Sequence, residues 1–171
     1  MERVIFYGDH EDQFIRLHLV PQSCENAASS SSSSSSPTSQ LPVMAIIHGG
    51  FFKQKYNISN SGVESLLPSL LLHSFHVCFI EYQRVNIHDQ SGSFPHTNQD
   101  IILAINKLSL LREELHFGSL ILLGHSAGGT LALWSCCLPA IRSLKYTPLL
   151  CVALAPIGNL IEGQLLRSVS S

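Results

Sequence analysis

The sequence predicts an α/β fold in which helices flank a mostly parallel sheet. Apolar, strand-like runs alternate with helix-like stretches from residue 42 onward, which is the order of successive βαβ units. The later strand-like runs are apolar throughout rather than at every second residue, as in strands covered on both faces. Of the 171 residues, 45% are hydrophobic and 13% are charged, enough apolar material for one domain with its own core.

The elements follow in a clear order. Residues 4–6 and 14–19 surround the polar turn GDHED and predict two short strands. Residues 27–40 include eight consecutive serines and predict a low-complexity loop insertion, because such a tract buries nothing. The remaining expected elements are strand 42–47, helix 63–73, strand 76–82, helix 98–115, strand 119–123, helix 127–138 and strand 149–155. Thr97 and Asp100 fit a capping box at the start of the longest helix.

Composition excludes several classes of protein. The formal net charge is −2, from 10 basic and 12 acidic residues, and no basic stripe of the kind that binds nucleic acid is visible. No apolar run is long enough to span a membrane, and the acidic N-terminus does not resemble a secretory signal. The cysteines lack the spacing of a metal site, so we expect free thiols, no metal, no cofactor and a cytoplasmic location. The five cysteines are Cys24, Cys78, Cys136, Cys137 and Cys151.

The candidate nucleophile is Ser126. Residues 124–128 read Gly-His-Ser-Ala-Gly and match G-x-S-x-G, directly after an apolar strand and before a helical stretch. A nucleophile elbow needs this context, because its serine sits on a tight, strained turn that exposes Oγ. Gly124 and Gly128 let strand and helix approach each other, and the helix N-terminus favours negative charge at the site. The alternative is an ordinary strand–turn–helix with small residues at its tight positions.

A second motif, His48-Gly49-Gly50-Phe51, follows its own apolar strand. A backbone N–H of this segment and the N–H of Ala127 would together form an oxyanion hole for a tetrahedral intermediate. Glycine allows the chain to turn its amides toward a pocket with no side chain in the way. The alternative is a plain β-turn.

Both motifs resemble those of the α/β-hydrolase superfamily, in particular the esterases and formamidases close to hormone-sensitive lipase and kynurenine formamidase. The resemblance covers roughly residues 7–156. It rests on the segments YGDHEDQFIRLHL, IIHGGFFKQKY, FIEYQRV, SGSFPHTNQDI, LLGHSAGGTLALW and VALAP. It implies that residues 1–171 form a single incomplete domain, the N-terminal part of the hydrolase fold. That part has an antiparallel hairpin first and then βαβ units through the sixth strand.

The same resemblance implies the roles of the motif residues. Ser126 would attack the acyl carbon, while Gly49, Gly50 and Ala127 would supply the oxyanion hole. His48 and His125 would have scaffolding roles rather than acid–base roles.

The chain departs from the family pattern after Ser126. In this superfamily the triad runs in the order Ser, Asp or Glu, then His. Residues 127–171 contain no histidine and no aspartate, and their only acid is Glu162. His88 and His96 lie in a loop from which one of them might approach Ser126, but nothing in the sequence orients either ring. We therefore expect the triad to be incomplete.

The sequence thus predicts a serine hydrolase of small-acyl esters or formamides that is inactive as this 171-residue chain, because a serine without a base is not activated. Its expected partner is a small-molecule ester or amide. The alternative is a truncated isoform or pseudoenzyme that binds a ligand without converting it. If the strand at 149–155 ends the sheet, its apolar edge has unpaired backbone groups, and we expect the isolated chain to associate with itself.

Overall fold

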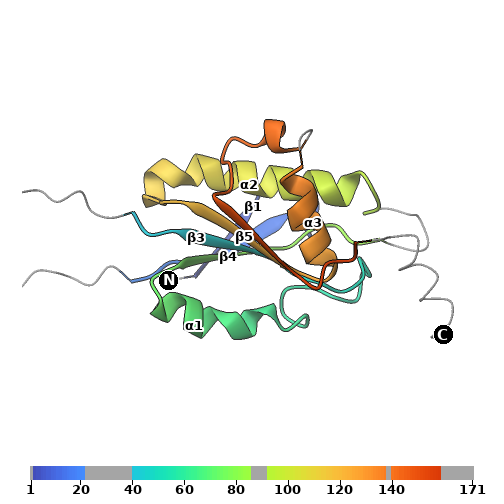
Figure 1. The fold of residues 1–171 in the computed structure, drawn as a ribbon, viewed down its shortest axis with the longest axis horizontal. Helices are drawn as coiled ribbons and strands as arrows, with labels where there is room; N and C mark the ends of the chain where they lie inside the picture. Colours follow the sequence, from blue (N-terminus) through green and yellow to red (C-terminus); the bar gives the residue numbers. More distant parts are fainter. Residues whose placement is uncertain (1, 22–39, 86–91, 138–139, 159–171) are drawn as a thin grey trace, which may run out of the picture.

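The computed structural model describes residues 2–21, 40–85, 92–137 and 140–158. Their strands form one six-stranded sheet with the order β1-β2-β4-β3-β5-β6 (Figure 1). The strands are β1 Glu2–Phe6, β2 Phe14–His18, β3 Val43–Ile47, β4 His76–Ile80, β5 Leu120–His125 and β6 Leu150–Leu154. Apart from Gln40, the predicted serine-rich insertion at 27–40 lies outside the described residues.

The sheet is mixed, and its parallel part carries the two motifs. Strands β1 and β2 form an antiparallel hairpin, and β2 also pairs antiparallel with β4. Strands β4, β3, β5 and β6 run parallel to one another. The predicted α/β class, with a hairpin first and parallel strands through the sixth, is therefore confirmed. Because parallel strands end at one edge of a sheet, the segments that follow β3, β4 and β5 meet there.

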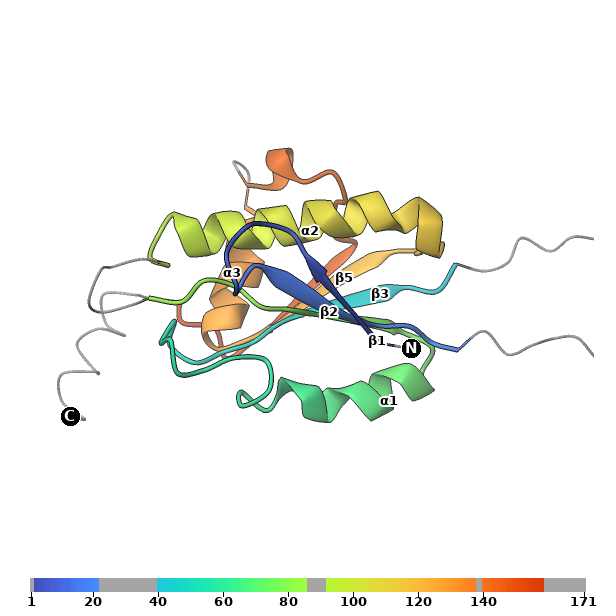
Figure 2. The ribbon, with the colours of Figure 1, turned by 180° about the vertical axis from the view of Figure 1, so that it is seen from behind.

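Helices cover both faces of this sheet. Helices α2 (His96–Leu115) and α3 (Ala127–Ser135) lie on one face, and α1 (Leu67–Leu72) lies on the other (Figures 1 and 2). Strand β3 is buried at all five positions, because its alternate side chains enter two separate cores. Val43, Ala45 and Ile47 belong to the core under α2 and α3, while Met44 and Ile46 belong to the core against α1. Two 3₁₀ segments, η1 (Val63–Leu66) and η2 (Ile141–Ser143), complete the described elements.

Proline is accommodated without breaking the helical segment predicted at 63–73. The chain turns first as η1 and continues as α1, so Pro68 falls in the first turn of α1. An N–H in the first turn of a helix has no intrahelical acceptor, and proline loses nothing by lacking one.

The predicted capping box of the longest helix is wrong. Helix α2 begins at His96 with Pro95 as its N-cap residue, and no side chain caps it. The Thr97 hydroxyl donates instead to the Gln83 carbonyl oxygen at 2.8 Å. The Asp100 carboxylate accepts from the Gln83 backbone N–H at 2.8 Å and from the Gln13 side chain at 2.7 Å. Both side chains therefore bind α2 to the segment after β4, and Asp100 also binds it to the turn of the β1–β2 hairpin. These partners are distant in the sequence, so a local pattern cannot predict the contacts.

Strand β6 is an edge strand of the sheet. Its end residues are half exposed, with Leu150 at 53% and Leu154 at 47% of their full accessibility. This is the arrangement on which the expected self-association depends. Within the described residues, no helix combines the length and apolar character needed to cross a bilayer.

Candidate active site

The elbow, residues 124–128, joins the end of β5 to the start of α3. Ser126 has φ 54° and ψ −119°, a conformation that strains a residue with a side chain. Its N–H donates to the Leu154 carbonyl oxygen at 2.9 Å, and its carbonyl oxygen accepts from the Thr130 N–H at 3.1 Å. The strained serine is therefore held between the edge strand and the first turn of α3.

The glycines of the elbow stand where backbone passes close to backbone. A Cβ on Gly124 would lie 2.2 Å from the carbonyl oxygen of Gly128. A Cβ on Gly128 would lie 2.1 Å from the Ile47 carbonyl oxygen and 2.5 Å from that of His48. The two glycines thus let α3 approach β5 on one side and the end of β3 on the other.

The glycine loop, residues 48–58, follows β3 and lies against the elbow. Strand β3 pairs with β5 so that Ile47 is opposite Gly124, which brings both motifs to the same edge of the sheet. A Cβ on Gly49 would lie 2.8 Å from the His125 carbonyl oxygen and 3.2 Å from the Ser126 Cβ. The structure therefore places Gly49 directly beside Ser126, the residue before Ala127.

The conformation of the next residues is also unusual. Gly50 has φ 125°, and a Cβ there would overlap the Tyr56 side chain. Phe51 and Phe52 have φ values of 57° and 59°. Phe52 packs against the main core, whereas Phe51 is exposed. The loop is thus sharply turned, with Phe52 packed against the core and Gly49 lying against the elbow.

His48 is completely buried and does not approach Ser126 as a base would. Its ring stacks on Tyr82 with 4.4 Å between ring centroids, and the Tyr82 hydroxyl donates to the His48 carbonyl oxygen at 2.8 Å. Its Nε2 lies 2.8 Å from Oε1 of Glu81, and its Nδ1 lies 2.8 Å from the Gly49 carbonyl oxygen. Burial lowers the pKa of His48 to about 4, whereas both ring nitrogens face acceptor oxygens, of which a neutral ring can donate to only one. The scaffolding role of His48 stays a prediction.

Glu81 is a residue that sequence reasoning missed, and it holds both ends of the glycine loop. One carboxylate oxygen faces His48, and the other accepts from the Ile58 N–H at 2.9 Å. The Arg84 guanidinium contacts the same carboxylate and also donates to Asp12 at 2.7 Å. Such a buried carboxylate requires a cation beside it. The signal available in the sequence was an acid within the strand-like run FIEYQRV, three residues before an arginine.

The other residues weighed as acid or base are not joined to the nucleophile. Within the described ranges, no hydrogen bond or ion pair connects a histidine ring to Ser126. His96 begins α2, and His125 is exposed at the end of β5. His88 and Glu162 lie outside the described residues. Among the described side chains, no three His, Cys, Asp or Glu residues gather where they would hold a metal ion.

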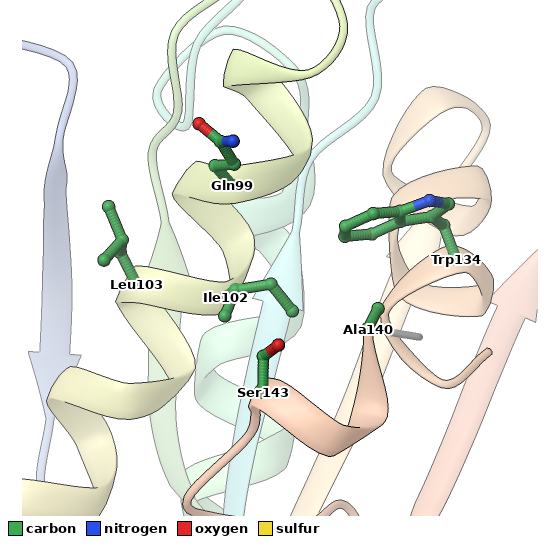
Figure 3. A pocket seen from close by; sticks show the side chains of 6 residues that line it. All are labelled: Gln99, Ile102, Leu103, Trp134, Ala140 and Ser143. Atoms are coloured by element: carbon green, nitrogen blue, oxygen red, sulfur yellow. The ribbon is translucent and has the colours of Figure 1, made fainter. Parts of the chain in front are cut away.

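A pocket of about 390 Å³ lies elsewhere, between α2, α3 and η2 (Figure 3). Its wall is mostly apolar, with the Trp134 indole facing Ile102 across the opening. None of its lining residues belongs to the elbow or to the glycine loop. It is therefore a separate feature of the helical face. The lining residues are Gln99, Ile102, Leu103, Trp134, Ala140 and Ser143.

Solved structures share this fold. An α/β hydrolase from a Medee basin deep-sea metagenome library is 22% identical, with a TM-score of 0.65 over 86% of this chain and 53% of that one. A carboxylesterase from Lactobacillus plantarum WCFS1 is 18% identical, with a TM-score of 0.67 over 95% of this chain and 58% of that one. Brefeldin A esterase, a bacterial homologue of human hormone-sensitive lipase, is 16% identical, with a TM-score of 0.61 over 96% and 43%.

These likenesses establish the α/β-hydrolase fold, and this chain spans only about half the length of those proteins. Comparison with curated proteins finds no match. The BD-FAE family profile matches residues 33–146, which include the glycine loop and the elbow. The chain therefore belongs to the BD-FAE family and has an α/β-hydrolase fold.

Proposed function

We propose that this chain carries the nucleophile and the oxyanion hole of a serine hydrolase that acts on small-acyl esters or formamides. Ser126 is the nucleophile, and N–H groups of Gly49, Gly50 and Ala127 are the oxyanion-hole donors. The observation that carries the proposal is the strained Ser126 backbone directly beside the glycine loop. Strain of this kind is maintained where a site requires a fixed geometry.

The chemistry assigned to these residues is acyl transfer. The Ser126 Oγ attacks the carbonyl carbon, and the oxygen of the resulting tetrahedral intermediate accepts hydrogen bonds from the backbone N–H groups. The attack requires a base to take the hydroxyl proton. Residues 127–171 contain no histidine to fill this role.

The substrate class follows from the family and from the loop. The likeness to a carboxylesterase and to brefeldin A esterase supports an ester, and the resemblance of the motif segments to kynurenine formamidase supports a formamide. Phe51, exposed next to the loop glycines, would form an apolar wall beside a small acyl group. No cofactor or metal enters this chemistry.

Labelling with a fluorophosphonate probe tests the nucleophile. Its phosphorus is attacked by an activated serine Oγ and fluoride leaves, so intact mass and peptide mapping identify the serine that reacts. We expect slow labelling at Ser126 that is lost in Ser126→Ala and retained in Ser69→Ala, which changes an exposed serine of α1. We also expect p-nitrophenyl acetate hydrolysis no faster than that of Ser126→Ala, because roughly 10⁴- to 10⁶-fold in rate depends on the complete triad.

Two results would contradict parts of this proposal. Labelling spread evenly over other serines would show that the elbow does not distinguish Ser126. Labelling within seconds would show that a base is present among residues 1–171, and variants of His88 and His96 would then identify it.

Residues 127–171 contain no histidine and no aspartate, which supports a second candidate function. In this candidate the protein binds an ester beside Ser126 without hydrolysing it. In that case an ester would bind and remain intact, and Ser126→Ala would bind it equally well. Equilibrium binding of an ester by a chain whose Ser126 the fluorophosphonate does not label would favour this candidate, whereas selective labelling at Ser126 favours the first. The four described cysteines are all free, which supports a cytoplasmic location for either protein.

A further inference from the structure

A second open pocket, of about 480 Å³, lies at the edge of the sheet opposite the elbow. Its wall combines the last turn of α2, the turn from α2 into β5, and residues 145–149, which precede β6. Strand β5 begins at this edge, whereas the elbow follows its other end. Because each residue of a strand advances the chain by about 3.3 Å, the six residues of β5 place the pocket roughly 20 Å from Ser126. The pocket is therefore separate from the proposed active site.

Within the described part of the chain, two cations and no carboxylate line this pocket. Arg112 belongs to the last turn of α2, and Lys145 belongs to the segment before β6. Neither side chain forms an ion pair with another described residue. Glu113 and Glu114 are the next residues of α2, but neither lines the pocket. The two cations give the pocket a formal charge of +2, on a chain whose formal net charge is −2.

The Arg112 guanidinium is held in place by the chain around it. Its Cζ lies 4.9 Å from the centroid of the Tyr146 ring, and its Nε donates to the Phe117 carbonyl oxygen at 3.4 Å. Tyr146 is only 4% exposed, and its hydroxyl donates to the Gly118 carbonyl oxygen. These contacts leave the two terminal nitrogens of Arg112 without a hydrogen-bond acceptor among the described residues. A guanidinium held in this way presents a planar fork of N–H donors, which matches the oxygens of a phosphate or a carboxylate.

The backbone that carries Lys145 is fixed as well. The Lys145 N–H donates to Oδ1 of Asn106 at 2.7 Å, and Nδ2 of Asn106 donates to the Ser143 carbonyl oxygen at 3.0 Å. One side chain of α2 therefore binds residues 143–145 at two points. The Lys145 ammonium consequently extends into the same pocket as Arg112 from a backbone that does not need to rearrange.

The rest of the wall offers hydroxyl groups and apolar side chains. Ser119 and Thr147 contribute the hydroxyls, while Pro148 and Leu149 contribute apolar surface. Leu149 is 74% exposed, so a ligand in the pocket would cover it. A volume of about 480 Å³ lies in the range of small-molecule sites and is more than one inorganic anion fills. The wall thus combines a place for an anion with a place for an apolar body.

We propose that this pocket binds a small organic phosphate, which is a phosphate monoester with an apolar body. Arg112 and Lys145 bind the phosphate oxygens, which also accept hydrogen bonds from the hydroxyls of the wall. The apolar body lies against Pro148 and Leu149. A phosphate monoester suits two unpaired cations, because it carries a charge of about −1.5 to −2 near neutral pH. The inference does not depend on the proposed hydrolase activity.

Binding of phenyl phosphate to the 171-residue chain tests the site. Isothermal titration calorimetry measures the affinity at about 0.15 M ionic strength, where exposed charges more than about 8 Å apart are largely screened. Phenyl phosphate supplies both the anion and an apolar ring, whereas inorganic phosphate and phenol each supply one of them. We expect phenyl phosphate to bind at least roughly tenfold more tightly than either, since only this probe uses both parts of the wall. Equal affinity for phenyl phosphate and one of the other two probes would overturn the proposal.

Single substitutions assign the binding to this pocket. We expect the affinity for phenyl phosphate to fall at least roughly tenfold in Lys145→Gln. The Lys145 side chain makes no contact with a described residue that holds the fold, so this variant should unfold in urea as the parent chain does. Arg142→Gln is the matched control, because Arg142 is an exposed cation of η2 that does not line the pocket, and its affinity should stay within about twofold of the parent. Arg112→Gln should bind as weakly as Lys145→Gln.

Two further results would overturn the proposal. Equal losses in Lys145→Gln and Arg142→Gln would show that binding follows net charge and not the pocket. A loss of affinity in Ser126→Ala would place phenyl phosphate at the proposed active site, whereas we expect this variant to bind it as the parent chain does.

Discussion

The glycine loop and the elbow lie side by side at the ends of β3 and β5, yet different interactions hold them. The loop depends on buried charge, since Glu81 contacts His48 at one end of the loop and the Ile58 N–H at the other. The elbow depends on close backbone packing around glycines and on a hydrogen bond to the edge strand. The stability of the loop should therefore depend on charge and pH, whereas the stability of the elbow should depend on side-chain volume.

Removing the carboxylate should have the largest effect and should act on the loop. In Glu81→Ala the Arg84 guanidinium stays buried with only Asp12 as its ion-pair partner, and Ile58 loses its acceptor. We expect a loss of about 3–5 kcal/mol in the free energy of unfolding, measured by urea denaturation. Glu114→Gln is the matched control, because its ion pair with Arg3 is exposed and contributes little. Equal stability of the two variants would mean that the buried network does not hold the loop.

Adding one methyl group should break the elbow without changing any charge. In Gly128→Ala the new Cβ would lie 2.1 Å from the Ile47 carbonyl oxygen, which is backbone and cannot move aside cheaply. We expect a loss of about 3 kcal/mol in the free energy of unfolding. Gly158→Ala, where a Cβ meets nothing within 4 Å, should be close to neutral. A neutral Gly128→Ala would show that α3 can move away from the end of β3.

The same contrast explains how much the sequence predicts. The elbow and the glycine loop are visible in the sequence because each is a local strand–turn signal with glycines at its tight positions, and the structure places both at one edge of the sheet. Glu81 is not visible, because its partners His48 and Ile58 are joined to it only by the fold, as is Asp12 to the neighbouring Arg84. The predicted capping box of Thr97 and Asp100 is wrong for the same reason. Their side chains hydrogen-bond to segments distant in the sequence instead of capping the helix, and a local pattern does not show these partners. The catalytic roles of Ser126 and the loop glycines stay predictions.

Acid should weaken the loop more than the elbow, and this is the smallest of the three expected effects. Burial lowers the pKa of His48 from 6.5 to about 4, so below pH 6.5 the unfolded chain takes up a proton that the folded chain resists. The loss of unfolding free energy that this causes is absent above pH 6.5, grows as the pH falls toward 4, and reaches up to about 3 kcal/mol. The unfolding free energy of His48→Asn should therefore fall less between pH 6.5 and pH 4 than that of the parent chain. Gly158→Ala should follow the parent curve. Parallel curves for parent and His48→Asn would show that the ring is already protonated beside Glu81 at neutral pH, with both its N–H groups donating.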